Sequence, residues 1–254
     1  MFTYDTDAVL AYWYGRPLPA REAFSAMGNF VLRLKHVSSL FENLFVEGET
    51  RYVPLHSDLS NLEQELAKVS RLRDLSYTNE DRKDVGFALT SFSRLGFDGS
   101  FVDAKSSKER LVDLSISCGQ LELGRKPVAP NSVILEMSPK VQTPPLLRGL
   151  FDETVRFWRP ADATIIRSDV RRPLGLTIGE VHPGWLTYIA DTSVADCVPA
   201  DFVCEPFVDG VVILAAERPG TADDPDYMAR LFRLRDALRP QGWLSKRAEL
   251  SKLP

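Results

Sequence analysis

The segment FVCEPFVDGVVILAA, residues 202–216, contains two apolar runs joined by Asp209-Gly210. Residues 202–208 and 211–216 have the composition of β-strands. An Asp-Gly pair between two such runs is a strong hairpin signal, because both central positions of the favoured turn need a positive φ. The segment therefore predicts an antiparallel β-hairpin with Asp209 and Gly210 at its turn.

Strand signals also occur earlier in the chain. Residues 111–118 alternate apolar and polar side chains, which is the period-two pattern of a half-buried strand. Residues 85–93, 132–137, 163–166 and 185–189 are further strand candidates, whereas residues 79–84 and 105–110 are polar and read as exposed loops. The repeated short strands favour an extensive sheet.

Four helices are expected from apolar residues spaced three and four apart. The first covers residues 20–45, after Pro17 and Pro19, and the second covers 58–74, where Ser60 and Glu63 have capping-box spacing. The third runs from Pro144 to about residue 158. The last begins at Asp224-Pro225, because proline is tolerated in a first helical turn. Its outer face and the following tail are basic: Arg230, Arg233, Arg235, Arg239, Lys246, Arg247 and Lys252.

This order of elements predicts an α+β fold, with a mostly antiparallel sheet and helices packed on it. No linker rich in glycine, proline or serine divides the chain, so residues 1–254 are expected to form a single α+β domain. The best position for a sub-division lies near residues 138–145.

Composition narrows the function class. The pI near 5.5 argues against nucleic acid as the main partner, because phosphate binding needs a basic surface. No apolar run is long enough to span a bilayer, and the first residues lack a secretory signal pattern. Three cysteines are few and odd in number, and Cys197 and Cys204 have no histidine partner set for zinc. We expect a cytoplasmic protein with free thiols that binds no membrane, metal or cofactor.

Charge is distributed unevenly. Residues 191–226 hold nine acidic side chains and one basic side chain, Arg218, although the whole protein carries a net charge of only −4. Like charge gathered in one segment creates a field that steers a cationic partner. A solvated face that binds nothing is an equally ordinary outcome of such a composition. The nine acidic residues are Asp191, Asp196, Asp201, Glu205, Asp209, Glu217, Asp223, Asp224 and Asp226.

Catalytic motifs are largely missing. The chain has no phosphate-binding glycine loop, no Gly-x-Ser-x-Gly elbow and no His-Glu-x-x-His pattern, and structural or surface roles are expected for its three histidines. One fragment, Asp98 with Asp103-Ala104-Lys105, matches loosely the Asp…Asp/Glu-x-Lys metal site of restriction-type nucleases. Neighbouring glycines and serines favour a loop there. A small metal-dependent hydrolase or nuclease using Asp98, Asp103 and Lys105 is the alternative function.

Two aromatic residues near the acidic segment have two possible roles. Trp185 and Tyr188 lie in a turn-to-strand segment, where core packing is the ordinary role. Tyrosine and tryptophan also dominate interface hot spots, so both residues are candidate anchors for a partner.

A family resemblance extends these observations. The segments PGWLTYI (183–189) and PFVDGVVI (206–213), with the early Tyr14-Gly15-Arg16-Pro17, resemble the immunity protein 52 family. The resemblance spans most of the chain and implies an antitoxin for a polymorphic toxin delivered between bacteria. It implies more particularly the immunity partner of a type VI secretion effector with a restriction-endonuclease-like DNase domain. The family offers no catalytic motif to transfer.

The charge pattern and the family resemblance together predict that this protein masks its toxin stoichiometrically and without catalytic turnover. A DNase presents cations to hold phosphate, and an inhibitor that displays carboxylates fits such a cleft and associates fast. Binding away from the cleft through an apolar patch, or a structural role as an adaptor in a secretion complex, remain open alternatives. The predicted partner-binding residues are Asp191, Asp196, Asp201, Asp223, Asp224, Asp226, Trp185 and Tyr188.

Overall fold

The computed structural model describes residues 6–48, 51–77, 89, 96–120, 131–176 and 180–245. The chain divides into two compact units. Unit 1 comprises Met1–Tyr14 with Val133–Pro254, and unit 2 comprises Gly15–Ser132. The expected strand at residues 85–93, the expected loop at 79–84 and the basic tail from Lys246 onward lie outside the described residues, apart from Leu89.

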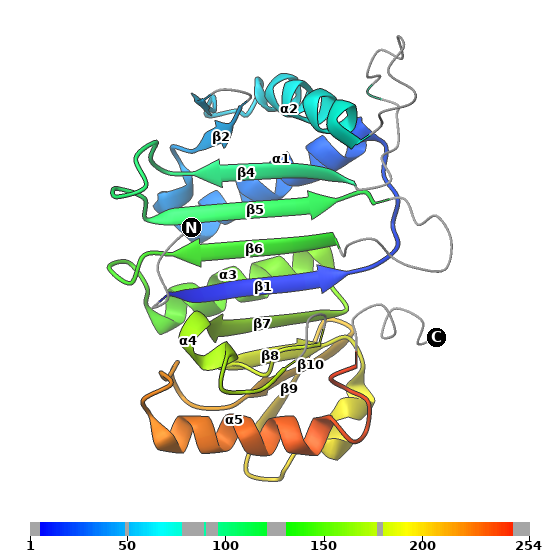
Figure 1. The fold of residues 1–254 in the computed structure, drawn as a ribbon, viewed down its shortest axis with the longest axis vertical. Coiled ribbons are helices and arrows are strands. Elements are labelled where there is room, and N and C mark those ends of the chain that lie inside the picture. Colours follow the sequence, from blue (N-terminus) through cyan, green and yellow to red (C-terminus); the bar gives the residue numbers. More distant parts are fainter. Residues whose placement is uncertain are drawn as a thin grey trace. The chain divides into compact units, whose positions relative to one another are not determined.

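The strands form one ten-stranded antiparallel sheet, which confirms the predicted α+β class (Figure 1). Their order is β3-β2-β4-β5-β6-β1-β7-β8-β10-β9. The bounds are β1 Asp7–Trp13, β2 Phe45–Glu47, β3 Tyr52–Pro54, β4 Phe97–Val102, β5 Val112–Cys118, β6 Asn131–Met137, β7 Asp162–Arg167, β8 Leu186–Ile189, β9 Val203–Phe207 and β10 Gly210–Leu214.

In unit 2, α1 (Ala20–Val37) packs on β4 and against α2 (Leu62–Tyr77). The expected first helix is too long, because Ser38 is extended at φ −157 and its hydroxyl accepts a hydrogen bond from the Leu40 amide. A serine that bonds its own backbone competes with helix continuation. A short 3-10 helix, η1 (Ser39–Phe41), follows. The predicted strand at residues 111–118 is confirmed as β5, with strictly alternating burial.

In unit 1, α3 (Pro144–Trp158) packs on β1 and β7. It begins where predicted, with Thr143 as its cap, and its apolar stripe is buried. The short helices α4 (Ser168–Arg171) and η2 (Thr192–Cys197) follow, and α5 (Pro225–Leu238) closes the unit. The stripe predicted for α5 is also buried, so periodicity located the inner face of both long helices: Leu147, Leu150, Phe151, Thr154, Val155 and Trp158 in α3, and Tyr227, Leu231, Leu234 and Leu238 in α5.

The hairpin of residues 202–216 is confirmed as β9 and β10, but its turn is one residue earlier than predicted. Gly210 pairs with Phe207, so the two turn residues are Val208 and Asp209. Val208 has φ +53, whereas Gly210 belongs to β10. A Cβ on Gly210 would lie 2.0 Å from the carbonyl oxygen of Ile189. Gly210 therefore serves the close approach of β8, and not the turn.

The loop predicted for the segment that contains Asp98 and Asp103 is wrong for its first part, because residues 97–102 form β4, whereas residues 103–111 lie outside helices and strands. A Cβ on Gly99 would lie 2.8 Å from the Phe101 ring and 2.9 Å from the sulfur of Met27 on α1. Glycine at this position lets the helix approach the sheet closely. The sequence reading also missed β1, which lies between β6 and β7 in the sheet.

Candidate functional site

Three carboxylates gather where α5 begins, and we call Asp223, Asp224 and Asp226 the acidic end of α5. Asp224 caps the helix, because its Oδ1 accepts hydrogen bonds from the amides of Asp226 (3.1 Å) and Tyr227 (3.0 Å). Negative charge is favourable at a helix N-terminus, which explains why a concentrated acidic group is tolerated there. All three residues are exposed, and in the described part of the chain none of them forms an ion pair.

A second pair of predicted acidic residues lies on η2. Asp191 caps this helix, accepting hydrogen bonds from the amide (2.9 Å) and hydroxyl (2.6 Å) of Ser193, and Asp196 is exposed. η2 contacts α5 and, drawn in yellow, lies toward the carboxyl-terminal end of that helix in Figure 1. Asp191 and Asp196 therefore belong to a different element from the acidic end of α5.

Asp201 belongs to a different arrangement. Its carboxylate pairs with Arg230 (3.1 Å) and Arg233 (2.5 Å) of α5, and these hydrogen bonds hold the pKa of Asp201 below its usual range. Both guanidinium groups also lie over the ring of Phe202, at 4.6 and 5.8 Å from its centroid. The negative charge of Asp201 is therefore offset on the surface of this protein.

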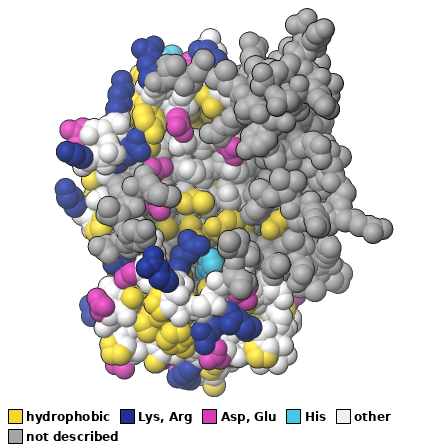
Figure 2. Space-filling view, in the orientation of Figure 1, with side chains coloured by type: hydrophobic (Ala, Val, Ile, Leu, Met, Phe, Trp, Pro, Cys, Tyr) yellow, Lys and Arg dark blue, Asp and Glu magenta, His cyan; other side chains and the backbone are white. Residues whose placement is uncertain are grey.

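The charges of two other residues in the acidic segment are also offset by arginines. Glu205 pairs with Arg148 at 2.7 Å, and Asp209 pairs with Arg159 at 2.7 Å. The arginines that the sequence suggested as a basic face of α5 also have partners, such as Glu180 for Arg239. Figure 2 accordingly shows acidic and basic side chains interspersed over the part of the surface that includes α5. Of the nine acidic residues in 191–226, those without an ion pair among the described residues are Asp196, Glu217, Asp223, Asp224 and Asp226, which are exposed, and Asp191, which is half-buried.

The predicted aromatic anchors lie inside the fold. Trp185 is 5% exposed and its Nε1 donates to the carbonyl oxygen of Ala216 at 2.9 Å, while Tyr188 is fully buried in β8. A Cβ on Gly184 would lie 2.2 Å from the carbonyl oxygen of Ile165. The segment 183–189 is thus a packing motif that brings β8 against β7. Neither aromatic side chain presents surface to a partner, and we omit both from the candidate surface.

One hydrogen bond and one packing contact fix the chain on either side of the acidic end of α5. Asp169 of α4 accepts a hydrogen bond from the Ala222 amide at 3.2 Å, and its other oxygen binds Nε of Arg167 at 3.2 Å. Tyr227 is buried with its ring against Gly220, where a Cβ would lie 2.4 Å from the ring. Sequence reasoning missed Asp169 because its partner is 53 residues away and no local pattern marks it.

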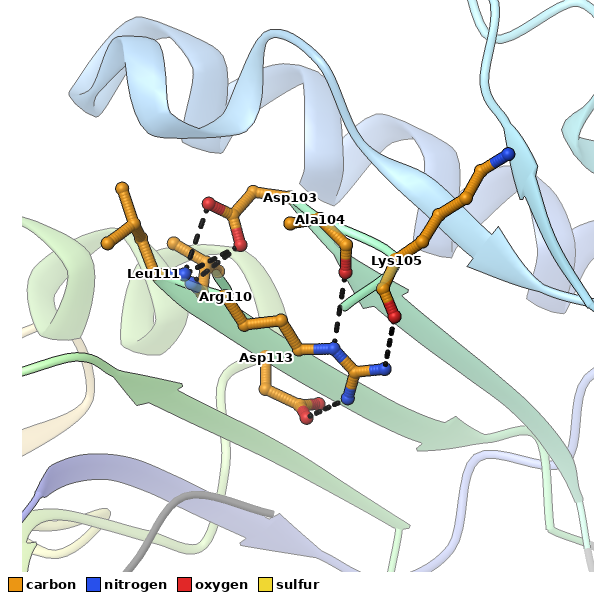
Figure 3. A network of polar contacts seen from close by, with 7 residues as sticks. Asp103, Ala104, Lys105, Arg110, Leu111 and Asp113 are labelled. Carbon is orange, nitrogen blue, oxygen red and sulfur yellow. Dashed lines mark hydrogen bonds and ion pairs between the residues drawn. The ribbon is translucent and has the colours of Figure 1, made fainter. Parts of the chain in front are cut away.

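The residues of the alternative nuclease site have structural roles in the β4–β5 hairpin (Figure 3). Asp103 accepts hydrogen bonds from the amides of Leu111 (2.9 Å) and Val112 (2.9 Å). Arg110 bonds the carbonyl oxygens of residues 104 and 105 and pairs with Asp113 at 3.5 Å. The ammonium group of Lys105 points away from Asp103 and lies 5.2 Å from the centre of the Phe45 ring.

Asp98 does not converge with this group. It lies in β4 and accepts a hydrogen bond from the hydroxyl of Ser117 across the strand pair. Asp98 and Asp103 are five positions apart along an extended backbone, which corresponds to about 16 Å. Among the residues that the structure describes, no group of three or more His, Cys, Asp or Glu side chains could hold a metal ion. The geometry therefore gives the nuclease alternative no assembled site.

Comparison with known proteins identifies a similar fold. No protein-family model matches the chain, and no curated protein sequence matches it. The fold is similar to the solved structure of the Pseudomonas aeruginosa T6SS protein PA0821, with a TM-score of 0.52 and 16% sequence identity. The similarity covers 92% of this chain and 72% of that chain. Within the described ranges, no helix has both the length and the apolar character needed to cross a membrane.

Proposed function

We propose that this protein is an immunity protein that binds a cognate type VI secretion toxin and neutralises it by stoichiometric masking in the cytoplasm. The observation that carries the proposal is the similarity of fold to a T6SS protein over 92% of the chain. The resemblance of residues 14–17, 183–189 and 206–213 to the immunity protein 52 family supports the finer assignment. The proposal involves no catalysis by this chain.

The partner we propose is a cationic DNase domain. Six of the nine carboxylates in residues 191–226 have no ion pair in the described part of the chain, and three of them lie at the acidic end of α5. A surface that holds phosphate is positively charged and is attracted to such a group at long range. Because Asp201 is already paired with two arginines, we retain Asp191, Asp196, Asp223, Asp224 and Asp226 as the proposed contacts.

Co-expression tests the function directly. Cells that make the toxin encoded beside this gene should regain growth when they also make this protein, and the two purified proteins should elute as one complex. Absence of rescue and of a complex would refute the proposal. Incubation of the purified chain with DNA and Mg²⁺ tests the alternative, and cleavage that disappears in Asp103→Asn would replace an immunity function by nuclease activity.

A charge-matched pair of variants tests the electrostatic contribution. Replacing Asp223, Asp224 and Asp226 with Asn should slow toxin association about tenfold at low salt and flatten its salt dependence. The control replaces three exposed acids of unit 2, Glu42, Glu47 and Glu109, with Gln and changes the net charge equally. If the two triple variants associate at the same rate, the acidic end of α5 does not steer the toxin.

A second contact surface has a specific observation in its favour. Val203 (56% exposed) and Val208 (40% exposed) on or beside β9 are two of the three exposed large hydrophobic residues among those described. β9 is an edge strand, and Pro206 within it has no N–H to offer an added strand. A partner would therefore contact side chains here. Replacing both valines with Ser should weaken toxin binding if this patch is used, and Leu32→Ser on α1 is the matched control.

A further inference from the structure

A buried carboxyl group lies in unit 1 where α4 and α5 approach the sheet. Asp7 is the first residue of β1, is 6% exposed and pairs across the strands with Arg167 of β7. Among the described residues, the charged or titratable groups that face it are Arg167, Asp169 of α4 and Tyr227 of α5. Burial raises the pKa of Asp7 to about 6, although Arg167 opposes the rise and Asp169 adds to it.

The segment from Gly220 to Tyr227 closes over this group. Its fixed points are the Ala222 amide, which donates to Asp169, and the Tyr227 side chain, which is 5% exposed and packed on Gly220. Burial and the nearby Asp7 carboxyl raise the pKa of Tyr227, so this phenol stays neutral at physiological pH. The cover therefore contributes no compensating charge to Asp7.

We propose that residues 220–227 form a pH-sensitive cover over the Asp7–Arg167–Asp169 cluster, and that ionisation of Asp7 favours its opening. With a proton on Asp7, Arg167 keeps its ion pair with Asp169 at 3.2 Å, and Asp169 holds the Ala222 amide. Loss of that proton places a second carboxylate beside the Arg167–Asp169 pair in a poorly solvated site. Opening the cover lets water reach Asp7 and relieves this unfavourable arrangement.

The direction and size of the pH effect on opening of the cover follow from linkage between opening and proton binding by Asp7. The closed state has the higher pKa, about 6, and an open state with solvated Asp7 has the ordinary value of 3.8. Proton loss above pH 3.8 thus favours the open state increasingly, until both forms are ionised above pH 6. Between pH 5.0 and pH 7.5 the opening constant should rise about tenfold.

The coupling between ionisation of Asp7 and opening of the cover does not depend on the identity of the partner. Its consequence for binding does rest on the proposed function, since the cover carries Asp223, Asp224 and Asp226. A toxin that contacts the acidic end of α5 in its closed form would bind in competition with opening. A test without toxin therefore separates failure of this inference from failure of the immunity proposal.

Amide hydrogen exchange of the full chain tests the inference, with each measured rate divided by the intrinsic rate at the same pH. Protection of the Ala222 and Tyr227 amides should fall about tenfold from pH 5.0 to pH 7.5 in the wild type. Asp7→Asn should abolish this change and keep both amides protected. Asp152→Asn, at another partly buried carboxylate whose pKa is raised, should leave it intact.

Two results would overturn the inference. One is protection in the wild type that does not change with pH, and the other is an Asp7→Asn variant with the same pH dependence as the wild type. Circular dichroism checks that the variant folds. If Asp7→Asn does not fold, Asp169→Asn replaces it. That change weakens the acceptor of the Ala222 amide and removes one of the two carboxylates, so it should lower protection at pH 5.0 and reduce the pH dependence.

Discussion

Substitution of Gly210 separates two explanations for the Asp-Gly pair. If Gly210 were a turn residue, asparagine would replace it readily, because asparagine tolerates a positive φ. The structure places Gly210 in β10 instead, where a Cβ would lie 2.0 Å from the carbonyl oxygen of Ile189 and 2.7 Å from the Cα of Ala190. Any side chain with a Cβ, asparagine included, should therefore be rejected.

The free-energy cost of the substitution follows from the 2.0 Å distance between the added Cβ and the Ile189 oxygen. Real Cβ atoms essentially never lie within 3.0 Å of such an atom, so β8 and β10 must separate locally by about 1 Å. Overpacking of a tight site costs about 1–3 kcal/mol, and strand hydrogen bonds stretched by the separation add about 1 kcal/mol each. We expect Gly210→Ala and Gly210→Asn each to lower the free energy of unfolding by about 3 kcal/mol or more.

Urea unfolding followed by circular dichroism measures the effect. Val208→Asn is the informative counterpart, because Val208 is a β-branched residue at φ +53 and asparagine should relieve strain of about 1 kcal/mol. Gly175→Ala is the control, since Gly175 has φ +60 and open space around it, and should cost only about 1 kcal/mol. A tolerated Gly210→Asn together with a destabilising Val208→Asn would refute the close-approach explanation and restore the turn at 209–210.

Two further stability predictions concern carboxylates. Because the pKa of Asp7 is raised from 3.8 to about 6, the free energy of unfolding of the wild type should fall as pH rises through this interval. Asp7→Asn should not show this loss. Urea midpoints should show that the variant gains about 3 kcal/mol of stability relative to the wild type between pH 3.5 and pH 7.5. Equal pH profiles for the two proteins would contradict this. Asp103→Ala leaves the amides of Leu111 and Val112 without their acceptor and should cost about 1–3 kcal/mol in the same assay. A loss below about 0.5 kcal/mol would show that water replaces the carboxylate there.

Local patterns predicted those elements whose burial repeats with a regular period. The bounds of α3 matched because Thr143 and Pro144 mark its start and five apolar residues and Thr154 define its inner face. β5 was recognised because polar and apolar residues alternate along it. In contrast, β1 is apolar on both faces and has no alternation. A continuous apolar run does not by itself distinguish a strand from a buried helix.

The candidate surface was predicted less completely than the fold. The carboxylates at the start of α5 are exposed as expected, since local capping and helix polarity keep charge there. Asp201, Glu205 and Asp209 are instead paired with arginines 29 to 57 residues away. A count of charges along the chain does not predict such ion pairs, because they form only when separate helices pack beside β9.

The sequence by itself determined the α+β class, the inner faces of the helices and the hairpin near the end, because each depends on side chains a few residues apart. The tertiary structure decided which acidic groups remain without an ion pair, why glycine stands at 99, 184 and 210, and that Asp7 is buried beneath the start of α5. These outcomes depend on the distance between backbones brought together from remote parts of the chain. Neighbouring residues do not encode that distance, because it is fixed only when the strands and helices pack.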